Sequence, residues 1–496
     1  MIDQTKCIGC HACTTACKSE NDVALGVFRT WVKNVDAGVF PETRRHFAVL
    51  RCNHCANAPC VAICPTSAMY QRPDGLVDFD DKACIGCKAC MQGCPYDAIY
   101  IDPVSDTAAK CNFCSHRVDQ GLLPACVVVC PVEALVFGDR NDPASRVSRL
   151  LAERQVKVRR PEQKTIPHAF YIGAADAALD PLAAQDAGML AWADRRMSGG
   201  ADSLRHVRSS AHPPARLTYD IPKATPWGWK VSAYIWTKSI ATGAALVPAL
   251  LHAFGFHTRE PVYTRDAAAV ALIFLAITGV LLVADLKRPE RFWMILVRPQ
   301  WRSWLAKGAY VISAYGAILA VWVWGLWNGY DRLMDALAWP VIGLSLLTAI
   351  YTAFLFGQCE GRDLWQGRLL IFHLALHSLI AGAGILYVIG SVSAHVALRP
   401  FAPWLALALG LSAALALLDA LGPHRTANAR AGAWHMTHGR NALLFWISVL
   451  AGMAIPALIF LLLPGWYRVG AVMAVSFGLF GYGHAFVTAG QKPPIS

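Results

Sequence analysis

The stretch CIGCHACTTAC, residues 7–17, decides the class of the N-terminal region, because it places four cysteines in the spacing C-x2-C-x2-C-x3-C. The same spacing returns in CIGCKACMQGC, residues 84–94. Two related quartets have wider gaps between their second and third cysteines. Sixteen of the seventeen cysteines fall in these four quartets, which are Cys7, Cys10, Cys13 and Cys17; Cys52, Cys55, Cys60 and Cys64; Cys84, Cys87, Cys90 and Cys94; and Cys111, Cys114, Cys126 and Cys130.

This spacing is the one with which bacterial ferredoxins bind 4Fe–4S clusters. Three close thiolates bind one cluster, and the fourth cysteine, beyond the tight loop, binds a different cluster. A proline follows the last cysteine of three quartets, at Pro65, Pro95 and Pro131. Four quartets therefore predict four 4Fe–4S clusters.

Zinc and disulfides are the alternative uses of so many cysteines. Zinc sites usually combine two separated C-x2-C pairs, or one such pair with two histidines, and four cysteines within about a dozen residues fit that pattern poorly. A disulfide framework would suit a secreted protein, but the N-terminus MIDQTKCIGC shows no secretory signal. Both alternatives are less consistent with the spacing than iron–sulfur clusters are.

The segments KCIGCHACTTACKSEN, residues 6–21, and KCNFCSHRVDQGLLPACVVVCP, residues 110–131, with the two quartets between them, resemble the electron-transfer subunit of molybdopterin oxidoreductases. That group includes DMSO, polysulfide, thiosulfate and arsenate reductases. The resemblance covers residues 1–172 and implies an α+β ferredoxin domain with an extension. It also implies that the first and fourth quartets exchange their last cysteines, as do the second and third. The implied sets are Cys7, Cys10, Cys13 and Cys130; Cys111, Cys114, Cys126 and Cys17; Cys52, Cys55, Cys60 and Cys94; and Cys84, Cys87, Cys90 and Cys64.

The rest of the chain changes character twice. Residues 173–225 are rich in Ala, Gly, Pro and basic residues, and we expect a solvated linker there. From residue 226 the chain contains eight apolar runs of about 20 residues, long enough to span a bilayer. Tryptophan and tyrosine mark many of their ends, as in the aromatic belts of membrane proteins. The predicted spans are 232–254, 267–286, 303–327, 336–357, 369–392, 402–421, 442–464 and 466–490, which gives an all-α transmembrane domain over 226–496.

The charge distribution fits this division. Residues 231–496 carry 18 Lys and Arg against 9 Asp and Glu, and these charges lie beside apolar runs, so the net charge of +12 does not indicate a nucleic-acid partner. With eight spans, both ends of the domain share one side of the membrane. The loops on that side hold twelve Lys or Arg against five on the other. We therefore expect a bacterial inner-membrane protein with a cytoplasmic ferredoxin domain.

A second resemblance rests on WGWKVSAYIWTKSIATGA, residues 227–244, and on DLKRPERF, residues 285–292. These segments are similar to the NrfD-type membrane anchor of polysulfide reductase and its quinone-linked relatives. The resemblance implies two four-helix bundles and a quinone, either menaquinone or ubiquinone. Together the two resemblances imply a membrane-bound redox subunit that passes electrons between a separate molybdopterin-containing catalytic subunit and the quinone pool, with a sulfur compound or a related molecule as substrate.

Ionisable residues within membrane spans are costly and often functional. Quinone chemistry moves protons with electrons, so we expect titratable groups at the cluster-side ends of the helices. The candidates for quinone binding are Lys238, Asp285, Tyr310 and His373. No catalytic residue is assigned.

Other readings remain open for these residues. Lys238 could extend to the interface, Asp285 could pair with Arg288 or Arg291, and His373 and His377 could bind haem. The helices could also form a quinone-coupled proton-translocating module, or an anchor or assembly subunit with no quinone site of its own.

The four complete quartets give a direct prediction of metal content. Purified protein is expected to contain about sixteen iron atoms and a matching amount of sulfide, because each cluster holds four of each. Iron and sulfide analysis checks this. Half that amount, or abundant zinc, would contradict it.

Overall fold

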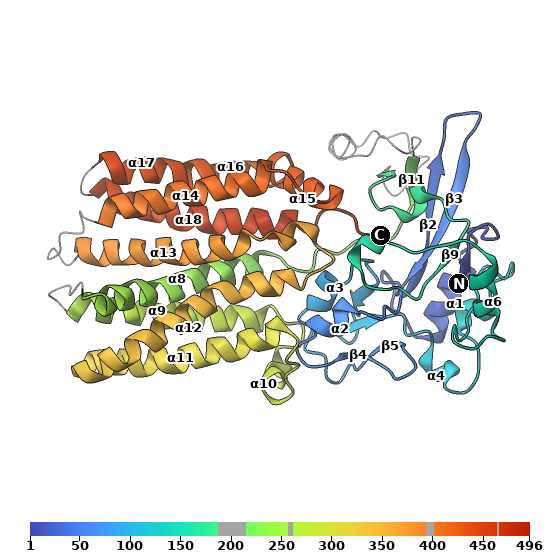
Figure 1. The fold of residues 1–496 in the computed structure, drawn as a ribbon, viewed down its shortest axis with the longest axis horizontal. Helices are drawn as coiled ribbons and strands as arrows, with labels where there is room; N and C mark the ends of the chain where they lie inside the picture. Colours follow the sequence, from blue (N-terminus) through green and yellow to red (C-terminus); the bar gives the residue numbers. More distant parts are fainter. Residues whose placement is uncertain (187–214, 256–260, 393–400, 464–465) are drawn as a thin grey trace. The chain divides into compact units, whose positions relative to one another are not determined.

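The computed structural model describes residues 1–186, 215–255, 261–392, 401–463 and 466–496 (Figure 1). The chain divides into two compact units. The first consists of residues 1–226 with two short additions, Cys359–Arg362 and Pro493–Ser496. The second consists of residues 227–358 and 363–492. The two units are described separately below.

The first unit is built from small sheets and short helices. Its largest sheet has the order β10 (Gln185–Asp186), β11 (Ala215–Tyr219), β2 (Thr30–Ala37), β3 (Arg44–Arg51), and β2 and β3 form an antiparallel hairpin. A second sheet joins β1 (Ile2–Asp3), β9 (Tyr171–Ile172) and β8 (Val156–Lys157). Two further hairpins pair β4 (Met69–Gln71) with β5 (Val77–Phe79), and β6 (Ile99–Ile101) with β7 (Ala108–Lys110).

Short helices follow the cysteine loops in this unit. Helix α1 (Ala12–Glu20) starts inside the first quartet, and α3 (Ala89–Gly93) starts at the matching place in the third. The remaining helices are α2 (Pro59–Ile63), α4 (Ser115–Val118), α5 (Ala125–Val128), α6 (Arg146–Glu153) and α7 (Asp176–Leu179).

Cysteine side chains form a large part of the core of the first unit. One buried cluster packs Cys13 and Cys126 against Trp31 and Tyr171 of the sheets. Another contains seven buried cysteines of the second and third quartets and Cys111, with few large apolar residues around them. Regions with so small an apolar core usually need metal centres to hold them together, and we expect the same here.

The expected linker, residues 173–225, is partly incorporated in the fold. Strand β11 (Ala215–Tyr219) pairs antiparallel with β2, and β10 (Gln185–Asp186) pairs with β11. Trp31 Nε1 also donates a hydrogen bond of 2.9 Å to Asp220. The composition suggested a solvated tether, but strand pairing depends on partners far away in sequence. Residues 187–214 lie outside the described part of the chain.

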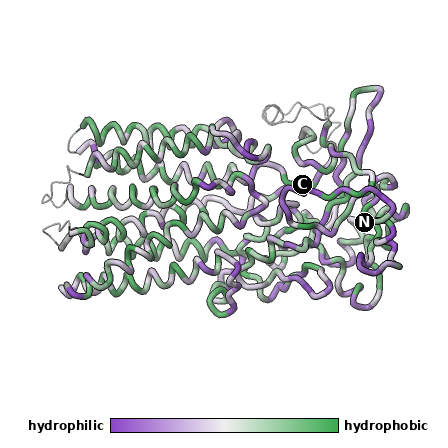
Figure 2. Tube along the Cα trace, viewed as in Figure 1, coloured by the Kyte–Doolittle hydropathy of each residue, from purple (hydrophilic) through white to green (hydrophobic). Residues whose placement is uncertain are grey.

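The second unit contains eight long helical segments, counted within its described residues, that run side by side and are mostly apolar (Figures 1 and 2). They lie close to the predicted spans. They are α8 (Trp229–Ala253), α9 (Pro261–Ala284), α11 (Trp304–Asn328), α12 (Asp331–Gly357), α13 (Leu370–Val392), α14 (Ala402–Leu421), α16 with α17 (Ala442–Val449 and Ile455–Leu462) and α18 (Trp466–Ala489). A five-residue π-helical turn, Leu450–Ala454, separates α16 from α17, just before Pro456.

Within the described residues, seven of these helices are long and apolar enough to cross a membrane, whereas eight spans were expected. The difference is α8. Its buried face includes Ser232, Thr237, Lys238, Ser239 and Thr242, which lower its mean hydropathy. Because α8 packs against α9, α12, α13 and α18, it is largely surrounded by protein and can carry polar groups. By contrast, only 28% of the residues in an apolar 18-residue stretch of α9 are buried, as suits a helix that faces lipid.

Two short helices were not expected from the sequence. They are α10 (Met294–Val297), between α9 and α11, and α15 (Ala427–His438), between α14 and α16. Helix α15 begins at a Thr426 cap whose hydroxyl accepts a hydrogen bond from the Ala429 N–H. The 3₁₀ turns Pro289–Arg291 and Asp363–Gln366 complete the connections.

Helices α8 and α13 meet at two glycines. A Cβ atom at Gly243 would lie 1.9 Å from the backbone oxygen of Ser378 and 2.7 Å from the backbone nitrogen of Gly382. Beside them, the hydroxyl of Thr242 donates to the hydroxyl of Ser378 at 3.0 Å. Small residues of this kind let membrane helices approach closely. This contact joins the group α8, α9, α11 and α12 to the group α13, α14, α16–α17 and α18.

Gly243→Ala is therefore expected to destabilise the second unit, because the new methyl group clashes with backbone atoms that cannot rotate away. The thermal unfolding midpoint of detergent-purified protein measures the effect. Gly279→Ala in α9 is the control, since a Cβ atom there meets nothing within 4 Å. Equal midpoints for the two variants would show that the α8–α13 contact is not close-packed.

Candidate functional site

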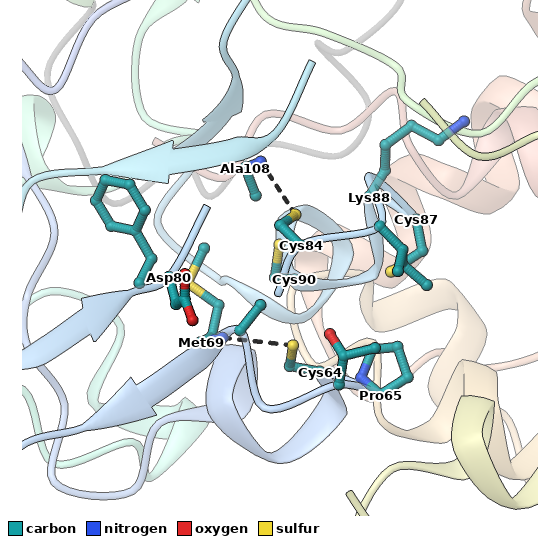
Figure 3. Close-up of a pocket in the computed structure, with 13 residues that line it drawn as sticks. Cys64, Pro65, Met69, Asp80, Cys84, Cys87, Lys88, Cys90 and Ala108 are labelled. Atoms are coloured by element: carbon teal, nitrogen blue, oxygen red, sulfur yellow. Dashed lines mark hydrogen bonds between the residues drawn. The ribbon is translucent and has the colours of Figure 1, made fainter. Parts of the chain in front are cut away.

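The cysteines of the first unit gather in four sets, and each set takes three members from one quartet and one from another. Three sets line cavities, and Figure 3 shows the cavity around Cys64 and the third quartet. The fourth set is Cys17 with Cys111, Cys114 and Cys126, which lie close enough for electrostatic interaction with Cys17. The other two cavities are lined by Cys7, Cys10, Cys13 and Cys130, and by Cys52, Cys55, Cys60 and Cys94. These are the sets that the family pairing implies, and their role as iron ligands stays a prediction.

A repeated backbone conformation shapes the cysteine loops. In the first C-x2-C pair of every quartet, the second intervening residue has a positive φ: 69° at Gly9, 45° at His54, 68° at Gly86 and 56° at Phe113. Residues in this left-handed region turn successive N–H groups toward one side of the chain, as in anion-binding nests. The loops are therefore shaped to present N–H groups toward an electron-rich group held by the thiols.

Backbone N–H groups already point at several of these sulfur atoms. The Met69 N–H donates to Cys64 Sγ at 3.4 Å, and the Ala108 N–H donates to Cys84 Sγ at 3.4 Å (Figure 3). The Ala134 N–H donates to Cys130 Sγ at 3.3 Å. Hydrogen bonds to ligand sulfurs are one of the ways in which proteins set the potential of an iron–sulfur cluster.

One buried cation lies beside the set that contains Cys126. Arg51 is 3% exposed, and its Nη1 donates to Cys126 Sγ at 3.3 Å. Its guanidinium also lies 5.6 Å from the centre of the Phe113 ring. Asn21 Nδ2 also approaches Cys114 Sγ, another member of this set, at 3.6 Å. The sulfur environment here is thus more polar than a plain apolar core.

The donor set fits an iron–sulfur cluster. Burial, together with neighbouring cysteines, raises the pKa of Cys13 to about 11 and that of Cys55 to about 12, so these thiols are neutral unless a cation joins them. Iron supplies that positive charge, and soft thiolates are the ligands it takes in such clusters. In the described residues, no group of three or more His, Cys, Asp or Glu side chains could hold a single metal ion.

In the second unit, Lys238 is completely buried between α8 and α12. Its Nζ donates to the carbonyl oxygen of Ala349 at 3.0 Å and to the hydroxyl of Thr352. The ammonium also lies 4.6 Å from the ring centre of Tyr351. No carboxylate among the described residues forms an ion pair with it, so carbonyl, hydroxyl and ring contacts stabilise this cation.

His373 belongs to a second buried polar group. Its Nε2 lies 2.8 Å from Asp419 Oδ2 of α14 and 3.4 Å from the hydroxyl of Tyr482 of α18. His377, one turn further along α13, contacts the rings of both His373 and Tyr482. Three helices therefore bring a carboxylate, two imidazoles and a phenol together inside the bundle.

The other two candidates lie elsewhere. The Tyr310 hydroxyl donates to the Leu296 carbonyl oxygen at 2.6 Å, so this side chain is bonded to the connection between α9 and α11. Asp285 directly follows α9 and is partly buried. The sequence did not single out Tyr482, because a tyrosine in an apolar helix carries no distinctive signal, and it did not single out Arg51, whose cysteine partner is 75 residues away.

The exchange of cysteines can be tested by substitution. Cys64→Ser and Cys87→Ser are expected to remove or alter the same cluster signal, whereas Cys60→Ser should affect a different one. Electron paramagnetic resonance spectra of the reduced variants measure this. Cys64→Ser and Cys60→Ser acting on one signal would mean that each quartet holds its own cluster.

Comparison with known proteins agrees with this division of the chain. Residues 43–140 match the family described as 4Fe-4S dicluster domain, and residues 219–491 match the family described as polysulphide reductase, NrfD. A tetrathionate reductase subunit of Salmonella typhimurium is 46% identical over 186 residues, which is 37% of this chain and 74% of that protein. A polysulfide reductase chain of Wolinella succinogenes is 41% identical over 173 residues, which is 34% of this chain and 91% of that protein.

A third relative is the arsenate respiratory reductase iron–sulfur subunit ArrB of a Shewanella strain, 34% identical over 220 residues, which cover 35% of this chain and 94% of that protein. All three similarities cover about a third of this chain, whereas the NrfD match covers more than half of it. The chain therefore belongs to the polysulphide reductase NrfD family, as a multi-pass membrane protein that carries a 4Fe–4S electron-transfer domain in the same polypeptide.

Proposed function

We propose that this chain is the electron-transfer and membrane-anchor subunit of a molybdopterin oxidoreductase complex. The observation that carries the proposal is the four cysteine sets, each formed from two quartets, in a chain that also matches the NrfD membrane family. The sixteen cysteines of these groups would hold four 4Fe–4S clusters, which store and pass single electrons. Shared quartets keep neighbouring clusters at short, fixed separations.

The partners follow from the relatives. Their names describe subunits of tetrathionate, polysulfide and arsenate reductases, so a separate molybdopterin-containing catalytic subunit and a sulfur compound or related substrate suit this chain. The excess of Lys and Arg on one side supports a bacterial inner-membrane location with the iron–sulfur domain in the cytoplasm. Menaquinone or ubiquinone would be the membrane substrate.

The buried polar groups of the second unit supply what quinone chemistry requires. Reduction of a quinone takes up two electrons and two protons, and oxidation of the quinol releases them. His373 and Asp419, 2.8 Å apart, can hold and pass a proton, and the Tyr482 hydroxyl can bond to an oxygen of the headgroup. The Lys238 ammonium can stabilise negative charge on the other oxygen. Asp285 and Tyr310, which lie away from these two buried groups, remain separate candidates for quinone binding.

A proton-translocating role is the second candidate. It is favoured by the hydrogen bond between Thr242 of α8 and Ser378 of α13, because Thr242 also bonds to the Lys238 carbonyl and Ser378 lies next to His377. Hydrogen-bonded polar residues thus lie between the Lys238 group and the His373 group. Proton uptake into sealed vesicles, driven by quinol oxidation, would distinguish translocation from simple electron transfer.

Lys238→Ala and His373→Gln are expected to slow quinone-linked turnover at least tenfold, because each removes a group that would bind or protonate the headgroup. Iron content and electron transfer to a soluble dye should be unchanged. Asp285→Asn tests the separate candidate Asp285 in the same assay. His252→Gln is the matched control. It removes a similar His–Asp contact, 2.7 Å to Asp335, and His252 lies about 21 Å from Lys238 along α8.

The outcomes separate the candidate functions. Equal loss of dye and quinone activities would mean that the residues are only structural. Unchanged quinone activity in all the variants would place the site elsewhere. Absence of any quinone effect on the cluster signals of the parent protein would leave an anchor or assembly subunit.

A further inference from the structure

The segment Cys359–Arg362, between α12 and α13 in the sequence, is part of the iron–sulfur unit. It contacts α3, the short helix that contains one predicted iron ligand, Cys90, and ends just before another, Cys94. The Gly361 N–H donates to the carbonyl oxygen of Gln92 at 3.1 Å. The Arg362 Nε donates to the side-chain oxygen of the same glutamine at 2.7 Å.

The contact is tight and buried. Arg362 is 3% exposed and Gln92 is fully buried. A Cβ atom at Gly361 would lie 2.5 Å from the carbonyl oxygen of Cys94 and 2.7 Å from that of Gln92, so only glycine fits against this turn. The segment is therefore held in one position, and it fixes the Arg362 charge beside the turn that leads into Cys94.

Other cations approach the same turn. Arg160 Nη1 donates to the carbonyl oxygen of Pro95 at 3.3 Å, and the Arg159 guanidinium lies 5.4 Å from the centre of the Tyr96 ring. Carboxylates lie there too. Asp97 interacts electrostatically with Arg362 and lies 3.9 Å from the Lys223 ammonium, which is also 3.5 Å from Asp220, and the exposed Glu162 pairs with Arg160 at 3.2 Å. Three arginines and one lysine thus lie near the residues after Cys94, against three carboxylates.

We propose that Arg362 is a positioning residue that acts through Gln92 to raise the reduction potential of one cluster. This inference rests on the proposed function, and the cluster is the one bound by Cys52, Cys55, Cys60 and Cys94. A reduced cluster carries one more negative charge than an oxidised one. A fixed positive charge in a buried, weakly screened site stabilises the reduced form. A segment between two membrane helices would thereby set the potential at one point of the electron path.

The test compares the full-length parent with Arg362→Gln, Arg362→Lys and Arg368→Gln. Potentiometric titration in detergent, followed by electron paramagnetic resonance, gives the midpoint of each cluster without a catalytic partner or quinone. The relevant signal is the one that Cys94→Ser removes. Arg368, exposed and six residues beyond Arg362, is the control for loss of one charge from the same connection.

In Arg362→Gln, the ratio of reduced to oxidised cluster at a fixed potential is expected to fall at least tenfold, a shift of about 59 mV for one electron. Arg362→Lys should shift it less, and Arg368→Gln not at all. An unchanged midpoint in Arg362→Gln with full iron content would overturn the proposal. So would loss of the cluster in both Arg362 variants, since the arginine would then be only structural.

This outcome is separable from failure of the proposed function. If the clusters of the parent show the expected potentials but do not react with quinone, the proposed function fails while the role of Arg362 stands.

Discussion

The structure of the N-terminal unit depends on sixteen thiols that gather in four small groups, twelve of them buried. Buried thiols close to one another resist ionisation, and burial raises the pKa of Cys94 to about 11. They can become thiolates only when a cation shares their charge, and iron provides it. The strands and helices around them are too short to form an independent hydrophobic core. Cluster binding is therefore coupled to folding, and the protein around each cluster is arranged as a shell of N–H donors and fixed charges.

Much of this fold could be predicted from the sequence because its signals are local. Cysteine spacing indicated 4Fe–4S clusters, and their number, four, stays a prediction. Apolar runs gave the long helices to within a few residues, except at the start of α9 and α12, where the first turn contains polar residues. Eight long helices were expected and eight are present in the described residues, although only seven of them are apolar enough by mean hydropathy to be candidate membrane spans. Helix α8 contains Lys238 and several hydroxyl residues that hydropathy penalises, yet these groups find partners on α12 and α13. A hydropathy scale measures the cost of placing a polar group in lipid. It contains no information about a hydrogen-bond partner on another helix.

The candidate site shows the same limit. The sequence identified Lys238 and His373 because ionisable residues are rare in membrane spans. It did not identify the association of His373 with Tyr482, or of Cys126 with Arg51, since these pairs are 109 and 75 residues apart. Tyr310 was selected for its depth in the helix, but its hydroxyl bonds to the connection before α11. The position of a residue along a helix can be predicted from a sequence. The partner to which its side chain bonds depends on how the helices pack.

The fusion of the two parts in one polypeptide has a physical consequence for the iron–sulfur unit. Two buried cations of that unit, Lys33 and Arg159, donate to the backbone oxygens of Ser496 and Ile495, at 3.2 and 3.3 Å. Burial lowers the pKa of Lys33 to about 8, and the nearby charge of Asp220 opposes that shift. Without residues 493–496 these donors would lose their acceptors, at a cost of about 1–3 kcal/mol for each unsatisfied group and more for charged ones. Residues 1–226 are thus an incomplete unit by themselves, because the polar contacts that complete it come from segments beyond the membrane helices.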